Sequence, residues 1–353
     1  MTRKARAARA AAGAAVRIRS HAKVNLGLEV LGPRQDGYHE LRTIFQTLEL
    51  HDDLVLAPAP NAVTASCDHP GVPSDERNLA VRAAEALRAH AGVRQGVHIA
   101  ITKRIPVAGG MGGGSSNAAA VLLALDRLWG LGLGRDGLHP LARRLGADVP
   151  FFLLGGTALG LGRGDEVYPL FGQVEGEVVV ADPGRPVSTA AVFARCDATL
   201  TPRENAPTIF RFISSHLERR RDAFRLLRND LEAAALEEAP ELASQVERIR
   251  GILVREGALL TSLSGSGSSY FGLFREARQA RRAHSALRDA GVRAVRSRAL
   301  TLDRYRTFWA RTLGPGLRAR GWDQGRNGHH GNHGRQGHPG GRREAQGVRI
   351  DRL

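Results

Sequence analysis

The chain has 353 residues, of which 42% are hydrophobic, and a formal net charge of +16. This length is enough for two domains with cores of their own, and no apolar run approaches the ~20 residues that a membrane-spanning helix needs. The only two cysteines, Cys67 and Cys196, exclude a disulfide framework and a cysteine zinc motif. We therefore expect a cytoplasmic protein and, without a long apolar run, no membrane partner.

The positive charge is concentrated at the two ends of the chain. Residues 1–20 hold six basic residues and no acidic ones, and residues 314–353 hold eight arginines against three acidic residues. We interpret residues 1–16 as a basic flexible extension and residues 314–353, rich in Gly, Arg and His, as a disordered tail. A nucleic-acid-binding protein is the alternative, and it would lose affinity when these ends are trimmed. Because the charge lies outside the folded region, we expect no specific nucleic-acid partner.

Strand and helix patterns alternate between the two ends. In chain order, the sequence predicts strands over 16–32, 43–57 and 62–67, a helix over 76–92, a strand over 96–105, helices over 115–129 and 136–145, a strand over 176–184, helical segments within 229–257, two strands within 258–274, a helix over 275–291 and a strand over 292–300. Because no regular βαβ repeat emerges, this order favours an α+β fold of sheets with helices on one face. The least patterned stretch, 195–225, is a candidate domain connection.

Residues 106–129 read PVAGGMGGGSSNAAAVLLALDRLW, with glycine at five of the six positions from 109 to 114. A glycine loop before a helix is a recurring anion site, because unpaired amides point outward, the helix dipole favours negative charge, and bare glycines let phosphate oxygens approach. Ser115 and Ser116 can cap this helix and add hydroxyl donors or a metal ligand. A flexible loop before a core helix is the alternative, and it explains one or two glycines but not five.

Two familiar phosphate motifs do not match this stretch. The chain contains no Gly-Lys pair, so it has no Walker A loop. A dinucleotide-binding fingerprint would place an acidic residue about twenty positions on, at the end of a second strand, whereas more loop and helix follow here. The sequence therefore predicts a phosphate cradle of another kind.

Three charged residues stand out by type or setting. Only Lys4, Lys23 and Lys103 are lysines among 51 basic residues. Since arginine is used wherever charge alone is needed, Lys23 and Lys103 are candidates for positions that need a compact ammonium, with chance survival as the alternative. Asp148 lies in an apolar stretch before Pro150, where a carboxylate needs a partner or a task.

Three motifs, in order, resemble those of the GHMP kinases. They are AKVNLGLEVLGPRQDGYHELRT near the N-terminus, PVAGGMGGGSSNAA in the middle and LTSLSGSGSSYFGLF near the C-terminus. The segments AKVNLGL, RQDGYHEL, LGADVPFFLLGGTALGLGRGDEV and NDLE resemble in particular the kinases that phosphorylate the 2-hydroxyl of 4-diphosphocytidyl-2-C-methyl-D-erythritol in non-mevalonate isoprenoid synthesis. The resemblance covers residues from about 17 to 300.

The resemblance implies a two-domain fold with the active site in the cleft between the domains. An N-terminal ribosomal-protein-S5-domain-2-like domain at 17–170 would bind ATP, and a C-terminal ferredoxin-like domain at 171–313 would lie on the substrate side. It also implies ATP and Mg²⁺, a small-molecule substrate, and a monomer or weak homodimer. A homoserine or mevalonate kinase is the alternative within the superfamily, but the Tyr38–His39 loop and Phe193 suit an aromatic base better than a small aliphatic acid.

The resemblance also assigns roles to matching positions. Lys23 would hydrogen-bond the acceptor hydroxyl of the substrate and stabilise the negative charge that develops as the phosphate is transferred. Asp148 would take up the proton of this hydroxyl or only orient the hydroxyl. Tyr38 and Phe193 would sandwich cytosine while His39 hydrogen-bonds its edge, although Ala190 stands where the family usually has proline. The implied substrate-binding residues are Asn25, Tyr38, His39, Thr189, Phe193, Gly265, Ser266 and Gly267.

The implied ATP-binding residues are Asn78, Lys103, Pro106, Val107, Ala108, Gly109, Gly110, Met111, Gly112, Gly113, Gly114, Ser115 and Ser116. The magnesium ligands are not assigned, and Ser115 and Ser116 are candidates for them. Each residue also has a purely structural alternative: a surface lysine for Lys23 or Lys103, a turn aspartate for Asp148, a helix cap for Asn78, a core ring for Phe193 and a tight hairpin for residues 265–267.

Overall fold

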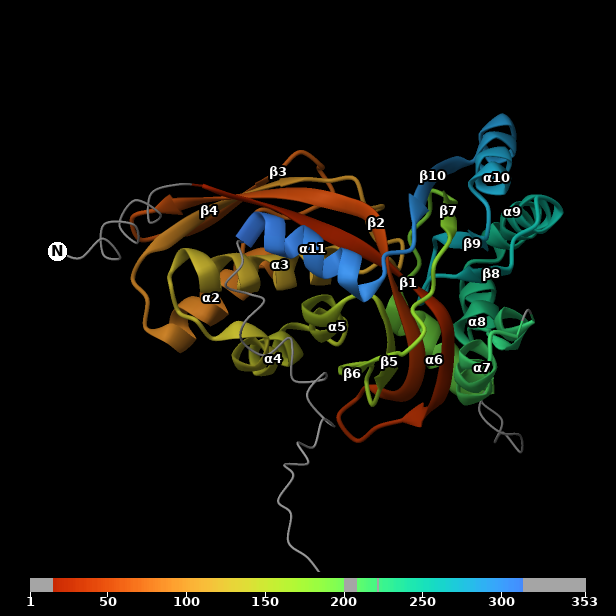
Figure 1. Cartoon of the computed structure of the whole chain (residues 1–353), viewed down its shortest axis with the longest axis horizontal. Helices are drawn as coiled ribbons and strands as arrows, with labels where there is room; N and C mark the ends of the chain where they lie inside the picture. The colour runs from red at the N-terminus through yellow and green to blue at the C-terminus, as the bar shows by residue number, and fades with distance from the viewer. Residues whose placement is uncertain (1–14, 200–207, 221, 314–353) are drawn as a thin grey trace, which may run out of the picture.

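A long antiparallel hairpin, β1 (Val16–Pro33) and β2 (His39–Ala59), runs from one half of the molecule into the other (Figure 1). The structure is a computed structural model and describes residues 15–199, 208–220 and 222–313. Residues 1–14 of the expected basic extension and the whole expected tail lie outside the described residues. Among the described helices, none is long and apolar enough to cross a membrane.

The first half is a six-stranded sheet covered on one face by helices. Its strand order is β3-β4-β2-β5-β6, with β1 paired to β2 outside this path. Apolar side chains of the sheet and of the helices below it form one core, in which the middle of α3 is buried on all sides. The further elements of this half are β3 (Val63–Cys67), β4 (Gly96–Thr102), β5 (Thr157–Leu161), β6 (Glu166–Pro169), α2 (Leu79–Ala91), α3 (Gly113–Leu128), α4 (Gly134–Leu145) and α5 (Val149–Leu154).

The second half is a four-stranded antiparallel sheet with the order β10-β7-β9-β8. In chain order it has the strand, helix, strand, strand, helix, strand pattern of a ferredoxin-like domain, with the several helices from α6 to α9 in the first helical place, which confirms that expectation. One face packs on helices, and the other packs on β1 and β2. The elements are β7 (Glu177–Asp182), α6 (Thr189–Thr199), α7 (Thr208–Leu217), η1 (Ala223–Leu226), α8 (Leu231–Glu238), η2 (Pro240–Leu242), α9 (Ala243–Arg255), β8 (Leu260–Leu263), β9 (Tyr270–Phe274), α10 (Ala277–Asp289) and β10 (Arg293–Arg298).

The α+β class and the predicted strands and helices are confirmed, and the structure adds elements that were not predicted, among them α5 and α6. Helix α3 begins at Gly113, two residues before the predicted start, so Ser115 and Ser116 lie inside its first turn and neither caps it. The stretch 195–225, interpreted as a connection, contains α7, whose Ile209 and Phe212 are fully buried. Strands β5 and β6 were not predicted, because they are short and one of them contains glycine.

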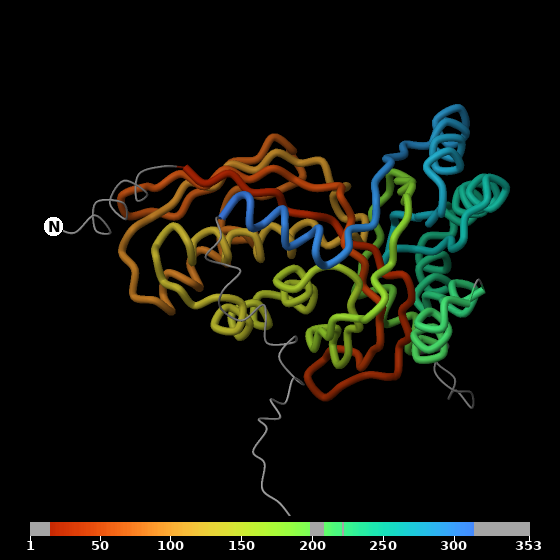
Figure 2. Tube along the Cα trace, in the orientation of Figure 1, coloured from red at the N-terminus to blue at the C-terminus, as the bar shows by residue number. Residues whose placement is uncertain are grey.

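The last described helix, α11 (Leu302–Leu313), was also missed in the sequence. The chain returns from β10 to the first half (Figure 2). There Tyr305, Trp309 and Leu313 of α11 join the first core. The Tyr305 hydroxyl donates to the carbonyl of Phe152, 2.6 Å away. This helix therefore lies with the N-terminal half, although the expected boundary at 170/171 groups it with the C-terminal half.

Helix α11 also helps to bury His21 of β1. The His21 ring lies 5.5 Å from the Tyr305 ring and 5.1 Å from the Phe308 ring, measured between centroids. Its Nδ1 donates to the carbonyl of Leu48 at 3.1 Å, and no partner for Nε2 is found among the described residues. Burial, with a smaller effect of the nearby His51, lowers the pKa of His21 to about 3.

This buried histidine is expected to make folding stability fall in mild acid. Below about pH 6.5, His21 is protonated in the unfolded chain but stays neutral in the folded chain down to its pKa of about 3. Folding stability is therefore lost as the pH falls from about 6.5 towards 3. Urea unfolding of His21→Gln at pH 7 and pH 5 should show a pH-dependent loss of stability about 2 kcal/mol smaller than in the parent chain. His90→Gln, an exposed position on α2, is the control and should follow the parent. Equal losses in parent and His21→Gln would contradict this account.

Candidate active site

A cavity of about 740 Å³ opens between the two halves of the molecule. Its wall is built from β1, β2, the glycine loop, the start of α5, helix α6 and the loop between β8 and β9. Of the residues expected in the site, the following line it: Lys23, Asn25, Tyr38, His39, Gly110, Gly112, Ser115, Asp148, Thr189, Phe193, Gly265 and Ser266. Segments far apart in the sequence thus meet at one hollow.

The glycine loop leads directly from strand β4 to the N-terminus of α3. Gly112, the residue before the helix, has a φ of +67°, and a Cβ at this position would lie 2.8 Å from the Phe152 ring. The first amides of α3 have no acceptor within the helix, because an α-helix leaves its first N–H groups unpaired. Met111 is buried in the core between the two halves, while Gly110, Gly112 and Ser115 face the cavity. The loop is therefore anchored on one side and open on the other.

A second glycine-rich loop, residues 264–269 between β8 and β9, packs on the first. The Ser264 hydroxyl donates to the carbonyl of Gly110 at 3.0 Å, and the Ser269 amide donates to the carbonyl of Gly109 at 3.3 Å. Gly110 has a φ of +72°, and a Cβ on it would overlap the carbonyl of Ser264. Residues 265–267 form the hairpin loop of the structural alternative and also approach the glycine loop, while their role in substrate binding stays a prediction.

Lys23 and Asp148 face one another across the cavity wall. The Lys23 Nζ lies 3.3 Å from Asp148 Oδ2 and donates to Asn25 Oδ1 at 2.6 Å. Asn25 in turn donates to the Thr43 hydroxyl at 2.8 Å, so the lysine is held by a chain of buried hydrogen bonds. The Lys23 side chain is 5% exposed and that of Asp148 is 31% exposed. Asp148 precedes α5 but its side chain makes no cap hydrogen bond to this helix. Its carboxylate instead lines the cavity and pairs with Lys23.

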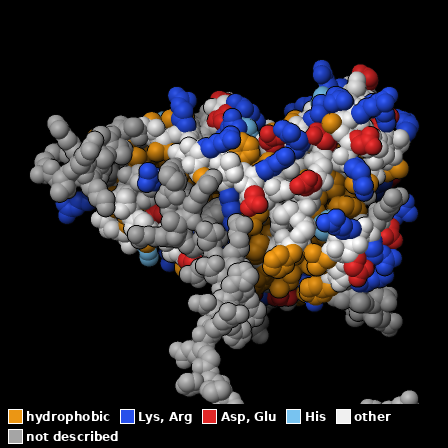
Figure 3. Space-filling view, viewed as in Figure 1, with side chains coloured by type: hydrophobic (Ala, Val, Ile, Leu, Met, Phe, Trp, Pro, Cys, Tyr) orange, Lys and Arg blue, Asp and Glu red, His pale blue; other side chains and the backbone are white. Residues whose placement is uncertain are grey.

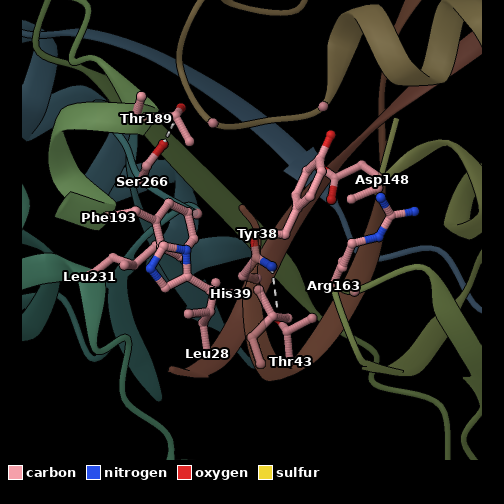
Figure 4. A pocket seen from close by; sticks show the side chains of 18 of the residues that line it. Leu28, Tyr38, His39, Thr43, Asp148, Arg163, Thr189, Phe193, Leu231 and Ser266 are labelled. Atoms are coloured by element: carbon pink, nitrogen blue, oxygen red, sulfur yellow. Dashed lines mark hydrogen bonds between the residues drawn. The ribbon is translucent and has the colours of Figure 1, made fainter. Parts of the chain in front are cut away.

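Three aromatic side chains, expected to bind the base, line the cavity in two places (Figure 4). The rings of His39 and Phe193 stack with centroids 4.5 Å apart. The Tyr38 ring stands separately, with the Arg163 guanidinium 4.6 Å from its centroid. Thr189 on α6 shares a 2.7 Å hydrogen bond with Ser266, which ties α6 to the second glycine-rich loop. The His39–Phe193 stack and the Tyr38–Arg163 contact are therefore separate parts of the cavity wall.

Three residues expected to contact ATP have partners inside the protein. Asn78 caps α2 by accepting from the Ala80 amide and donates to the Pro73 carbonyl. Lys103 is 5% exposed and forms an ion pair with the fully buried Asp52, under Gly113 at the start of α3. The Ser116 hydroxyl accepts from Ser20 at 2.8 Å and is fully buried, whereas Ser115 faces the cavity.

The remaining loop residues differ in exposure. Val107, Ala108 and Gly114 are exposed, whereas Gly109 is buried and Pro106 and Gly113 are partly exposed. Gly267 is part of the second glycine-rich loop, where its φ is +89°. The first glycine loop, residues 106–114, is thus not covered by other side chains.

Several residues of the site were missed in the sequence. Asp52 accepts from the amides of Arg104 and Ile105 as well as from Lys103, and so fixes the entry to the glycine loop. Asn229 donates to the carbonyl of Gly265 at 2.7 Å and fixes the second loop. The NDLE segment that contains Asn229 was a signal for this role, whereas nothing in the sequence marked Asp52.

Arg163 is also a missed residue, and a buried carboxylate holds it in place. Asp165, 1% exposed, accepts from both Arg163 and Arg143 at 2.8 Å. Burial on its own would raise the pKa of Asp165, but the hydrogen bonds from the two guanidinium groups hold it below the usual range. Asp165 therefore remains a carboxylate and fixes the guanidinium on which Tyr38 rests.

Comparisons with known proteins identify the family of this chain. The GHMP kinases N terminal domain model matches residues 78–156, and the GHMP kinases C terminal model matches residues 212–293. A 4-diphosphocytidyl-2-C-methyl-D-erythritol kinase from Gloeobacter violaceus is 43% identical over 267 residues, which are 74% of this chain and 86% of that protein.

Two solved structures show the same fold. A crystal structure of a 4-(cytidine 5'-diphospho)-2C-methyl-D-erythritol kinase, 38% identical, has a TM-score of 0.65 and covers 80% of this chain and 98% of its own. A homoserine kinase from Cytophaga hutchinsonii, 18% identical, has a TM-score of 0.63 and covers 81% and 95%, and this likeness concerns the fold alone. The chain therefore belongs to the GHMP kinases, and within them to the 4-diphosphocytidyl-2-C-methyl-D-erythritol kinase family.

Proposed function

We propose that this protein transfers the γ-phosphate of ATP to the 2-hydroxyl of 4-diphosphocytidyl-2-C-methyl-D-erythritol, in the cytoplasm, as a monomer or weak homodimer. The observation that carries this proposal is the pairing of Lys23 and Asp148 at 3.3 Å in the same cavity as the open glycine loop. Two relatives with 43% identity are named 4-diphosphocytidyl-2-C-methyl-D-erythritol kinase, which supports the choice of substrate.

The glycine loop and the start of α3 are the proposed site for the ATP phosphates. Unpaired amides at a helix N-terminus bind anions through hydrogen bonds and through the helix dipole. Ser115 and the two cavity-facing glycines, Gly110 and Gly112, leave room for phosphate oxygens close to the main chain. The Lys103 ammonium, paired with Asp52, lies close to Gly113 at the start of this helix and adds positive charge there.

Lys23 and Asp148 are the proposed catalytic residues. The acceptor oxygen forms a bond to the γ-phosphorus while the bond from this phosphorus to the oxygen shared with ADP breaks. The hydroxyl proton passes to the Asp148 carboxylate, and the Lys23 ammonium stabilises the negative charge near the acceptor oxygen. Asn25 holds the ammonium in position through its 2.6 Å hydrogen bond.

Magnesium fits this site through oxygen donors. Among the described residues no group of three or more His, Cys, Asp and Glu side chains could hold a metal ion. Mg²⁺ at phosphoryl-transfer sites is bound mainly by the phosphates and water, with only one or two protein oxygens. Ser115, whose side chain is on the cavity side, would supply such an oxygen, whereas the Ser116 hydroxyl is buried against Ser20. The ion would offset the negative charge of the phosphates.

The substrate proposal is tested by a panel of alcohols. The purified chain is incubated with ATP, Mg²⁺ and, in turn, 4-diphosphocytidyl-2-C-methyl-D-erythritol, homoserine and mevalonate, and ADP release is followed. Only the cytidyl compound should give substrate-dependent ADP at a high kcat/KM. Turnover of homoserine or mevalonate with an equal kcat/KM would overturn the proposed substrate.

Tyr38→Ala should raise the KM for the cytidyl substrate much more than the KM for ATP. The tyrosine is 49% exposed on the cavity wall, and a stacked base loses about 1–3 kcal/mol when its aromatic partner is removed. We expect an increase in substrate KM of roughly tenfold or more. Tyr168→Ala, a 51% exposed tyrosine on β6 that does not line the cavity, is the control. Equal changes in both KM values would argue against base stacking.

The nucleic-acid alternative finds little support in the folded region. Arginines and acidic residues are interspersed over β10 and α10 in Figure 3, and several are paired. Arg282 bonds Glu256, and Arg296 and Arg298 bond Glu177 and Glu49. Because these positive charges are compensated locally, the face does not form a uniform basic surface.

A further inference from the structure

The His39 ring at the aromatic end of the cavity is held by a carboxylate from the other half of the molecule. Its Nε2 lies 2.9 Å from both Oδ1 and Oδ2 of Asp197. His39 begins β2, while Asp197 lies near the end of α6, 158 residues later. The His39 side chain is 12% exposed and that of Asp197 is 35% exposed, and both line the cavity. The mechanism above uses neither the carboxylate nor this contact.

This contact decides which nitrogen of the ring carries the proton. A carboxylate only accepts hydrogen bonds, so His39 Nε2 must be the N–H donor. In the neutral ring the other nitrogen, Nδ1, is then an acceptor. The stack on Phe193 restrains the plane of the ring as well. Among the described residues no hydrogen bond to Nδ1 is found, which leaves this acceptor to a ligand.

We propose that Asp197 is a positioning residue that makes the cavity specific for a base with an exocyclic amino group. This inference rests on the proposed function and on the role that the family resemblance implies for Tyr38, His39 and Phe193, which is to contact cytosine, the only flat aromatic group of the substrate. Cytosine offers an amino group, which donates to the Nδ1 acceptor. Uracil has a carbonyl oxygen at the same place, so two acceptors would face one another without a proton between them.

The variant Asp197→Asn tests this role while it keeps the size of the side chain. An amide can accept from Nε2–H through its oxygen or donate to a bare Nε2 through its nitrogen. The ring is then free to move its proton to Nδ1 and donate to a carbonyl. The variant should therefore bind the uracil nucleotide better than the parent chain does, while its affinity for the cytosine nucleotide changes little.

The measurement is calorimetric titration of the full chain with CDP and with UDP, together with kcat/KM for the cytidyl substrate and its uridyl analogue. The parent should prefer the cytosine compounds by roughly ten- to a hundredfold, the effect of one unpaired buried polar group. In Asp197→Asn this preference should fall below about threefold, mainly because UDP binds more tightly. The KM for ATP should stay within about twofold of the parent.

Glu238→Gln is the matched control. Glu238 on α8 accepts from Arg195 of α6, so this change removes a carboxylate that holds the same helix without touching His39. It should keep the parent's cytosine preference. If Asp197 served only to join the two halves, Asp197→Asn would weaken the binding of CDP and of UDP equally, and that result would overturn the inference.

The outcomes also separate this inference from the proposed function. If the parent chain turns over the cytidyl substrate and Asp197→Asn keeps the same base preference, the proposed role of Asp197 is wrong and the proposed kinase activity is retained. If the parent chain does not turn over the cytidyl substrate, the proposed function is wrong. In that case a preference for CDP over UDP that disappears in Asp197→Asn would still support the role of Asp197 in base selection.

Discussion

Asp148→Asn is expected to fold like the parent chain and to lose two to three decades of kcat or more. The amide keeps the shape of the carboxylate but cannot take up the proton of the acceptor hydroxyl, and it no longer offers a negative partner to Lys23, which lies 3.3 Å away. Loss of one such interaction in a phosphoryl or acyl transfer site typically costs about 3–4 kcal/mol in the transition state.

The folded state should tolerate this change, because the Asp148 side chain makes no cap bond and is 31% exposed. We therefore expect the thermal midpoint to move by only a few degrees, and the KM for ATP to change little, since the glycine loop is untouched. The measurement is steady-state ADP release at saturating ATP, with circular dichroism to check the fold. Asp136→Asn, an exposed aspartate on α4, is the control. Near-full turnover in Asp148→Asn would remove this residue from the mechanism.

The glycine loop and the proposed catalytic pair, Lys23 and Asp148, were accessible from sequence because each lies in a contiguous motif. The glycine loop is recognisable without a structure, since a simple turn before an apolar helix needs only one or two glycines and this stretch holds five. Lys23 and Asp148 were identified by lysine scarcity, by an acid in an apolar stretch and by resemblance, and the structure brings them to 3.3 Å. The order of strands in the second sheet followed from the family resemblance and not from local patterns.

The rest of the site depends on tertiary contacts that no local pattern encodes. Asp52 is an ordinary acidic residue on β2 until the fold places it under Lys103, and Asp197 becomes important only because α6 approaches the start of β2. Arg163 was one of many arginines, and its role follows from the buried Asp165 beside it. Such partners lie far apart in the sequence, so pattern and spacing cannot identify them.

Gly110→Ala is the second large effect that we expect. Residue 110 adopts a φ of +72°, and an added Cβ would overlap the main-chain carbonyl of Ser264 in the second glycine-rich loop. A flexible side chain could move aside, but this obstacle is backbone held by Asn229 and by the hairpin, so one of the two loops must shift. The kcat/KM for ATP should fall by about a hundredfold or more, because a displacement of about 1 Å in a positioning element has an effect of this size.

Gly130→Ala separates this clash from the cost of the backbone conformation. Gly130 follows α3 with a φ of +66°, close to that of Gly110, but a Cβ there meets nothing within 4 Å. By urea unfolding, Gly130→Ala should lose the roughly 1–2 kcal/mol that a left-handed non-glycine residue costs, and Gly110→Ala should lose at least as much because it also has the clash. Only Gly110→Ala should also lose catalytic efficiency with ATP. If both variants kept the parent's kcat/KM, the packing of the two glycine-rich loops would not control the phosphate site, and the proposed location of the ATP phosphates would have to be abandoned.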